Sequence, residues 1–235
     1  MMTIQVEQNS GLLLVNKPSG PTTYDLIRWL KKPLNGIKMG HAGTLDPLAT
    51  GLVVVLLGKT TKMQSIFMKF DKLYRCKFKL GVQTDTGDIT GQVVKTMRVP
   101  AIEKTHRQAI LESFLGEQMQ IPPLYSALKH KGMPLYKYAR KGQHVERPER
   151  KIHVRSVELV SSNGSDEWII RTLVSSGTYI RTLVEDIGQR LDSCATVLEL
   201  DRESVGAYRV QDAVDGILLK SYSATHIWSY VKTPS

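Results

Sequence analysis

The segment KLYRCKFKLG, residues 72–81, alternates between apolar and basic side chains. The two sets are Tyr74, Cys76, Phe78 and Leu80 on one face and Arg75, Lys77 and Lys79 on the other. A period of two places successive side chains on opposite faces of an extended strand. The segment therefore predicts a half-buried β-strand with a basic outer face, and the chain must fold so that other elements cover the apolar face of a sheet.

Strand and helix patterns alternate along the rest of the chain. An apolar strand at 11–17 is followed by a helix that Thr22 or Thr23 caps and that ends before Pro33. Further strand patterns lie at 51–58, 151–160 and 167–174, and further helical patterns at 59–70, 102–115 and 178–191. The last two strands flank a turn-rich segment, which predicts an antiparallel pair. With no internal repeat and no low-complexity linker, these patterns predict one mixed α+β domain.

The charge of the chain is concentrated in one segment. The formal net charge is +10, which favours a polyanionic partner. Most of it lies between Lys129 and Arg155, where nine basic residues stand against Glu146 and Glu149. Three tyrosines lie in or beside this segment: Tyr125, Tyr136 and Tyr138. A solvated charged face would explain the lysines but not the aromatic rings among them, whereas both together are typical of RNA contact.

The cysteine, histidine and apolar patterns limit the compartment and the cofactors. Cys76 and Cys194 form no C-x-x-C pair and lie in apolar stretches, which predicts two buried thiols in a reducing compartment. No apolar run reaches the roughly 20 residues needed to span a bilayer, and the N-terminus MMTIQVEQNS has no signal-peptide core. We therefore expect a cytoplasmic protein. The histidines and cysteines show no metal-ligand spacing, so no metal is expected.

Two short motifs look like known sites but do not match them. LLGKTTK resembles the end of a phosphate-binding P-loop, yet the first glycine of that motif would fall at Val53. Asp85-Thr86-Gly87 resembles the aspartic-protease triplet, yet the chain has no second copy to share a proton. A turn in the run TDTGDITG is the better interpretation.

The segment GHAGTLDPLATG, residues 40–51, contains a single carboxylate, Asp46, among small residues. Only His41 is titratable besides it. An acid followed by proline could simply cap a turn. It could equally be a reactive carboxylate in a permissive backbone, acting as a nucleophile or as a base. The segment alone does not decide between these readings.

This segment occurs together with five others in an order that resembles the TruB family of tRNA pseudouridine synthases. The others are NKPSGPTTYDLIRWL, KLYRCKFKLGVQTDTGDITG, PPLYSALKHKGMPLYKYAR, SSGTYIRTLVEDIG and LELDRESVG. The resemblance runs from Gly11 to about Gly206. It implies the α+β pseudouridine-synthase fold, with a central mixed, mostly antiparallel sheet flanked by helices, and an RNA-binding thumb insertion at about 122–147.

The resemblance also implies a reaction. The T-loop uridine of tRNA, position 55 in tRNA numbering, would be flipped out, detached from its ribose and rejoined through C5. Asp46 matches the family's essential aspartate, Arg181 the arginine that pairs with it, and Tyr74 the tyrosine that stacks on the target base. Taken alone, Tyr74 would be interpreted as core packing and Arg181 as a helix-surface residue. Whether Asp46 acts as covalent nucleophile or as base stays open.

Further matches concern RNA and substrate binding: His41, Tyr179, Leu200, Lys17, Lys62, Lys129 and Arg140. By resemblance, His41 fills the place that the flipped uridine vacates, and Tyr179 and Leu200 line the base pocket. Lys17 and Lys62 match basic residues near the active site, although Lys62 could equally lie on the exposed face of a helix. The last two residues of the set belong to the thumb, which closes over the T loop.

The C-terminus departs from the family pattern. Family members usually continue into a PUA domain, whereas only residues 207–235 follow Gly206. We expect a catalytic domain at 1–206 and a short C-terminal extension at 207–235. The implied partner is the T arm of tRNA, bound by a monomer with no cofactor, no membrane association and no obligate protein partner. The alternatives are the guide-RNA-dependent relative, which needs partner subunits, and a chaperone that remodels tRNA without modifying it.

Overall fold

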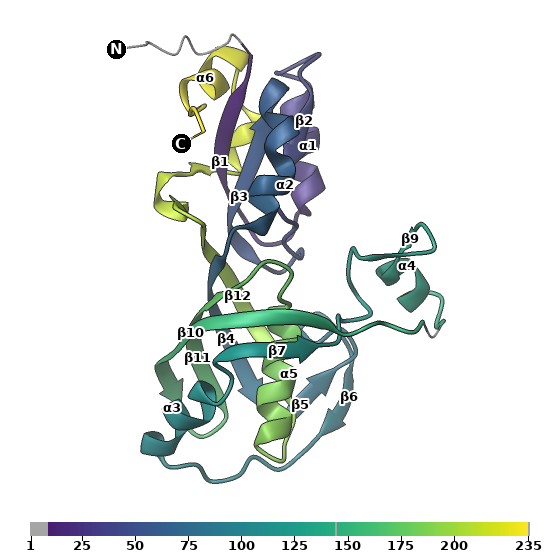
Figure 1. Cartoon of the computed structure of the whole chain (residues 1–235), viewed down its shortest axis with the longest axis vertical. Coiled ribbons are helices and arrows are strands. Elements are labelled where there is room, and N and C mark those ends of the chain that lie inside the picture. Colours follow the sequence, from purple (N-terminus) through teal and green to yellow (C-terminus); the bar gives the residue numbers. More distant parts are fainter. Residues whose placement is uncertain (1–8, 144, 235) are drawn as a thin grey trace. The chain divides into compact units, whose positions relative to one another are not determined.

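The computed structural model of the chain describes residues 9–143 and 145–234 (Figure 1). Residues 1–8, in which the sequence predicts no secretory signal, lie outside this range, as do residues 144 and 235. The described residues form two compact units. Unit 1 contains residues 9–72 and 201–234, and unit 2 contains residues 73–200. Within the described residues, no helix is long and apolar enough to cross a membrane.

Unit 1 is built on a mixed sheet. Its strands are β1 (Gly11–Lys17), β2 (Met39–His41), β3 (Thr50–Leu57), β13 (Tyr208–Arg209), β14 (Val214–Asp215) and the end of β12 (Ala195–Val205). β1 pairs antiparallel with β3 over its whole length, so the two apolar strands predicted from the sequence form the centre of this sheet. β14 runs parallel to β1, and Asp201 and Arg202 of β12 run parallel to β3.

Short helices complete unit 1: α1 (Thr23–Lys31), the 3-10 helix η1 (Gly58–Met63), α2 (Gln64–Lys69), η2 (Val210–Asp212), η3 (Leu218–Lys220) and α6 (Ala224–Ser229). Thr22 caps α1, because its hydroxyl accepts from the backbone of Asp25 while the Asp25 carboxylate accepts from the backbone of Thr22. The helix predicted over 59–70 is 3-10 in its first half. The core is formed by Leu12, Leu14, Ala42, Leu52, Val54, Leu56, Phe67 and Val205.

The C-terminal residues belong to unit 1. Leu12 and Lys232 exchange two backbone hydrogen bonds of 2.8 Å each, and Val15 of β1 pairs with Val214 of β14. Leu219 and Ile227 are buried. The segment that the sequence suggests as an extension after residue 206 therefore supplies part of the sheet and core of this unit. The assignment of 1–206 as the catalytic domain stays a prediction.

Unit 2 contains the second part of the sheet, in the order β12, β4, β11, β10, β7. The bounds are β4 (Lys72–Leu80), β11 (Glu167–Val174), β10 (Arg150–Asn163) and β7 (Gly116–Gln120). A small hairpin, β5 (Val82–Thr84) with β6 (Val93–Thr96), and the helices α3 (Lys104–Glu112) and α5 (Ile180–Arg190) accompany it. The antiparallel pairing of β10 with β11 and both helices confirm the sequence predictions.

Strand β4 confirms the alternation read from the sequence. Tyr74, Cys76, Phe78 and Leu80 are buried and the residues between them are partly exposed. Acidic side chains compensate this basic face, because Lys77 Nζ lies 3.0 Å from Glu167 and Lys79 Nζ lies 3.5 Å from Asp166. Cys76 and Cys194 are free and buried, as expected, and burial raises the pKa of the Cys76 thiol.

The segment predicted as the thumb, residues 122–147, projects from the ends of β7 and β10 (Figure 1). It contains the short hairpin β8 (Lys129–His130) and β9 (Met133–Pro134), followed by helix α4 (Leu135–Ala139). Lys131 and Gly132 form the hairpin turn with φ of 47° and 83°, as a two-residue hairpin loop requires. Tyr136 donates from its backbone to the carbonyl of Ser126 at 3.1 Å, which fastens α4 to the start of the thumb.

Candidate active site

Asp46 lies half-buried in the loop that connects β2 to β3. Backbone hydrogen bonds fix the loop near both ends. The amide of Ala42 donates to the carbonyl of Val54 at 3.0 Å, and the amide of Ala49 donates to the backbone carbonyl of Asp46 at 3.1 Å. In its middle, the backbone of Leu45 donates to the hydroxyl of Thr23 at 2.9 Å. The small residues that surround the acid in the sequence thus form a loop of defined shape.

Arg202, on β12, contacts this loop and was not identified from the sequence as a site residue. It is 1% exposed, and its guanidinium donates to the carbonyls of Leu52 at 2.7 Å, Gly43 at 3.1 Å and Thr44 at 3.4 Å. Gly51 permits the close approach of β12, because a Cβ there would lie 2.4 Å from the backbone oxygen of Arg202. The available signal was an arginine at a buried position of the alternating strand LELDRESV.

Lys17 holds the same loop from the other side. Its side chain is 0% exposed, and its ammonium donates to the carbonyls of Pro18 and Pro21 at 2.8 Å and of Pro47 at 3.1 Å. Burial lowers the pKa of Lys17 to about 8, against the opposing effect of Asp46, so the group is protonated at neutral pH. All three N–H donors have carbonyl partners. Lys17 is therefore placed to position the loop, and the RNA contact that the resemblance implies stays a prediction.

His41 and Lys62 flank the loop in unit 1. His41 ends β2 and is half-buried, with its carbonyl accepting from the Gln64 side chain at 3.0 Å. Burial lowers the pKa of His41, and the nearby Arg202 lowers it further, which favours the neutral form of the imidazole. Lys62 is exposed on η1. The sequence had left open whether Lys62 lies on an exposed helix face or contacts RNA.

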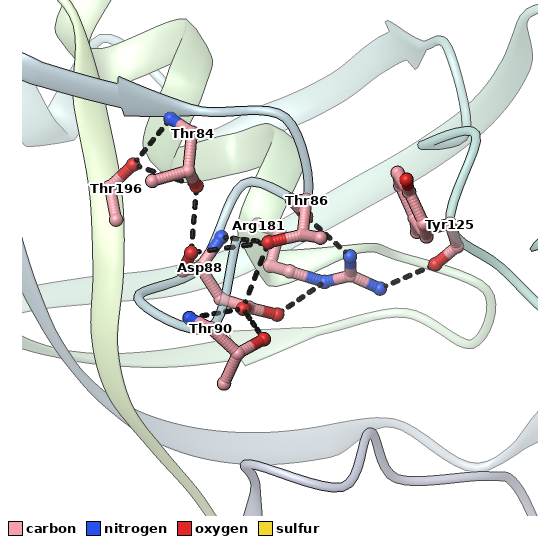
Figure 2. A network of polar contacts seen from close by, with 7 residues as sticks. All are labelled: Thr84, Thr86, Asp88, Thr90, Tyr125, Arg181 and Thr196. Carbon is pink, nitrogen blue, oxygen red and sulfur yellow. Dashed lines mark hydrogen bonds and ion pairs between the residues drawn. The ribbon is translucent and has the colours of Figure 1, made fainter. Parts of the chain in front are cut away.

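Arg181 lies in unit 2, at the start of α5, and is 4% exposed. Figure 2 shows its guanidinium donating to the carbonyl of Thr86 at 2.6 Å and to that of Tyr125 at 2.8 Å, with Nε 4.0 Å from the carboxylate of Asp88. This burial excludes the helix-surface interpretation. The pairing of Arg181 with Asp46, which lies in unit 1, stays a prediction.

Asp88 organises the TDTGDITG run around Arg181 (Figure 2). One carboxylate oxygen accepts from the backbone and hydroxyl of Thr90, at 3.0 and 2.5 Å, and from the hydroxyl of Thr86 at 3.0 Å. The backbone carbonyl of Asp88 accepts from Thr84 at 2.7 Å. The turn predicted for this run is therefore confirmed. It also places the buried carboxylate of Asp88 beside Arg181.

The remaining predicted pocket residues also lie in unit 2. Tyr74 on β4 and Leu200 on β12 are each 8% exposed. Tyr179 is half-buried at the N-cap of α5, with the guanidinium of Arg150 4.4 Å from its ring centroid. Lys129 and Arg140 are exposed in the thumb, as RNA contacts would require. Among the described residues, no group of three or more His, Cys, Asp or Glu could hold a metal ion.

The family model described as "TruB family pseudouridylate synthase (N terminal domain)" matches residues 31–180. The protein of Endomicrobium trichonymphae named tRNA pseudouridine synthase B is 47% identical over 204 residues, covering 87% of this chain and 88% of that protein. The protein of the same name from Opitutus terrae is 42% identical, covering 87% and 84%.

Solved structures agree on the fold. A chain from the crystal structure of a Cbf5-Nop10-Gar1 complex has a TM-score of 0.70 at 28% identity, covering 93% of this chain and 55% of that one. The archaeal box H/ACA Nop10-Cbf5 complex gives a TM-score of 0.68 at 24% identity, covering 97% and 58%. This chain thus spans little more than half of those chains. The fold is that of the pseudouridine synthases, as expected from the resemblance. Within this class, the chain belongs to the TruB family.

Proposed function

We propose that this chain is a tRNA pseudouridine synthase that converts the T-loop uridine at position 55 of tRNA to pseudouridine. The observation that carries the proposal is the loop of Asp46, which two buried cations, Lys17 and Arg202, hold in place in a member of the TruB family. Relatives covered over most of their length bear the name tRNA pseudouridine synthase B, which supports the choice of RNA.

The reaction is an isomerisation in which all atoms balance within the substrate. The bond from ribose C1′ to N1 of uracil breaks, the base turns, and a bond from C1′ to C5 forms. The proton on C5 is lost and a proton is taken up at N1, so no external reactant is consumed. The carboxylate of Asp46 starts the reaction as a nucleophile or as a base. Tyr74 stacks on the base, and Arg181 orients the carboxylate.

Access to C1′ requires the uridine to leave its stack, which costs a few kcal/mol. We assign His41 to occupy the vacated place. The lowered pKa of His41 suits this role, because an uncharged imidazole loses less solvation on entering a base stack than an imidazolium would. Tyr179 and Leu200 line the pocket that receives the base. Exposed thumb residues such as Lys129 and Arg140 bind the phosphates of the T arm.

The direct test uses the purified chain and one unmodified tRNA transcript, without guide RNA or other protein. Carbodiimide-blocked primer extension should stop at position 55, and replacing that uridine by cytidine should abolish the stop. Modification only after addition of guide RNA and partner subunits would contradict the proposal in favour of the guide-dependent alternative. Tight tRNA binding without any stop would contradict it in favour of the chaperone alternative.

A further inference from the structure

The two strands that carry the thumb meet at one residue pair. β7 ends at Gln120 and β10 begins at Arg150, and these two residues face each other in the antiparallel ladder at the end nearest the thumb. Arg147 donates to the carbonyl of Pro122 at 3.0 Å, which joins the two ends of the thumb just beyond this pair. Gln120 and Arg150 therefore lie where the thumb joins the sheet.

Gln120 holds the backbone of Tyr179. Its side chain is 2% exposed, accepts from the Tyr179 amide at 2.8 Å and donates to the Tyr179 carbonyl at 3.1 Å. The same carbonyl accepts the first helical hydrogen bond of α5, from Leu183 at 3.1 Å. Tyr179 itself is an N-cap without a side-chain capping bond. The side-chain amide of Gln120 therefore fixes the backbone of the N-cap residue through both its N–H and its carbonyl.

Arg150 holds the ring of the same tyrosine. Its guanidinium carbon lies 4.4 Å from the ring centroid, and its Nε is buried and has no hydrogen-bond partner among the residues that the structure describes. Gly177 also lies beside the guanidinium, since a Cβ there would be in ordinary van der Waals contact with it at 3.5 Å. A planar cation on a ring face is attracted by the ring quadrupole, and lysine cannot reproduce that planar contact. An unpaired buried N–H is costly, which marks Arg150 as placed for the tyrosine at the expense of its own hydrogen bonding.

We propose that Gln120 and Arg150 are positioning residues that fix Tyr179 from the base of the thumb, so that RNA bound by the thumb orders the base pocket. The proposal rests on the proposed function for the role of Tyr179 in base binding. A second contact agrees with it, because the carbonyl of Tyr125, at the start of the thumb, accepts from Arg181. Both proposed active-site residues at the start of α5 are thus tied to the thumb.

The test is a double-mutant cycle with the variants Arg150→Ala, Tyr179→Ala and the double variant, assayed on a T-arm hairpin. Arg150→Ala should lower kcat at least tenfold while KM changes less than threefold. In the Tyr179→Ala background, the same substitution should change kcat less than threefold. Arg150→Lys should not restore the activity. Arg190→Ala removes an arginine from the face of Phe114 at the other end of α5 and serves as the matched control, with activity within threefold of the wild type.

Two kinetic outcomes and one stability outcome would overturn the proposal. Independent, multiplicative losses in the double variant would show that Arg150 does not act through Tyr179, and a pure rise in KM would make Arg150 a direct RNA contact. If Arg150→Ala fails to fold, Arg150→Met keeps the cycle measurable. The unfolding midpoints of the same four proteins give a readout without activity, in which the double variant should match Tyr179→Ala. If the wild type is inactive but the stability losses of Arg150→Ala and Tyr179→Ala are not additive, the proposed function alone is contradicted. If the stability losses are additive, the positioning role is contradicted.

Discussion

At the scale of single residues, the Asp46 loop is organised by charges that the solvent does not reach. Arg202 and Lys17 together donate six hydrogen bonds to backbone carbonyls around the loop. Carbonyl oxygens directed at a buried cation replace the water that burial removes. The shape of the loop therefore depends on side chains 29 and 156 positions away in sequence from Asp46.

Lys17→Met should test this dependence. The substitution preserves an unbranched apolar stem and leaves three backbone carbonyls without the donor that Lys17 provides, so the free energy of unfolding should fall by about 2–4 kcal/mol. Guanidinium denaturation measures the change. Lys62→Met is the control, since an exposed lysine on η1 should change stability by less than about 0.5 kcal/mol. Equal effects of the two substitutions would contradict the structural role of Lys17.

Glu185 gives a pH-dependent prediction. Burial raises the pKa of Glu185 from 4.5 to about 7, Asp186 adds to the rise, and Arg181 and Arg147 oppose it. Because the folded-state pKa lies above the ordinary value, the folded state binds more protons between these two pH values. Above about pH 7 the ionised Glu185 therefore lowers the free energy of unfolding. As the pH falls from about 7 toward 4.5, the folded protein becomes protonated at Glu185 and the free energy of unfolding rises again.

Glu185→Gln should therefore be more stable than the wild type at about pH 8, and the advantage should shrink as the pH falls to about 5. Asp186, whose pKa burial raises to about 6, is present in both proteins and cancels in the comparison. Urea denaturation of both proteins across this range measures the difference. An advantage that stays constant with pH would show that ionisation of Glu185 is not its cause.

Among the helices and strands, the sequence patterns predicted those features that interactions between neighbouring residues determine. The alternation of β4 and the N-cap of α1 depend on neighbouring residues, and both are found: Thr22 is one of the two capping residues that the sequence predicted. The first half of the helix predicted at 59–70 is 3-10 instead, a difference in hydrogen bonding that the apolar spacing does not distinguish. Arg202 and Asp88 were missed because their partners are distant in sequence or lie in a turn, where no periodicity identifies them.

The thumb should contribute affinity without choosing the uridine. Lys129 and Arg140 are exposed, and Arg140 lies 5.6 Å from the ring of Tyr136, a pairing suited to phosphate and base contact. The logarithm of tRNA affinity should fall linearly with that of salt, by roughly 0.7 to 0.9 per phosphate neutralised. Lys129→Ala or Arg140→Ala should reduce this slope by about one phosphate in filter-binding titrations. A change in the position that is modified would contradict this account of the thumb.

At the scale of the whole molecule, both ends of the chain contribute to one unit. β1 lies between β3 and β14, so residues near the N-terminus pair with residues after position 206. The residues proposed for uridine capture, from His41 to Leu200, come from both units. The proposed function assigns both sets of residues to the same nucleotide.

We expect a T-arm hairpin to be sufficient for this. Specific RNA recognition relies mainly on unpaired loops, and the proposed capture residues and the thumb all address the T loop. Removing the acceptor stem should cost less than a factor of about ten in kcat/KM. Paired kinetics of the hairpin and the full-length unmodified tRNA at one salt concentration provide the comparison. A hundredfold loss on the hairpin would mean that other parts of the chain bind the acceptor side.

Whether Asp46 performs the chemistry is tested by comparing Asp46→Asn with the wild type on the same tRNA. The variant keeps the shape of the side chain, so we expect unchanged folding, tRNA affinity within about threefold, and no detectable pseudouridine. Asp85→Asn alters another carboxylate in a threonine- and glycine-rich turn and should retain wild-type activity. Pseudouridine formation by Asp46→Asn at a near wild-type rate would contradict the account.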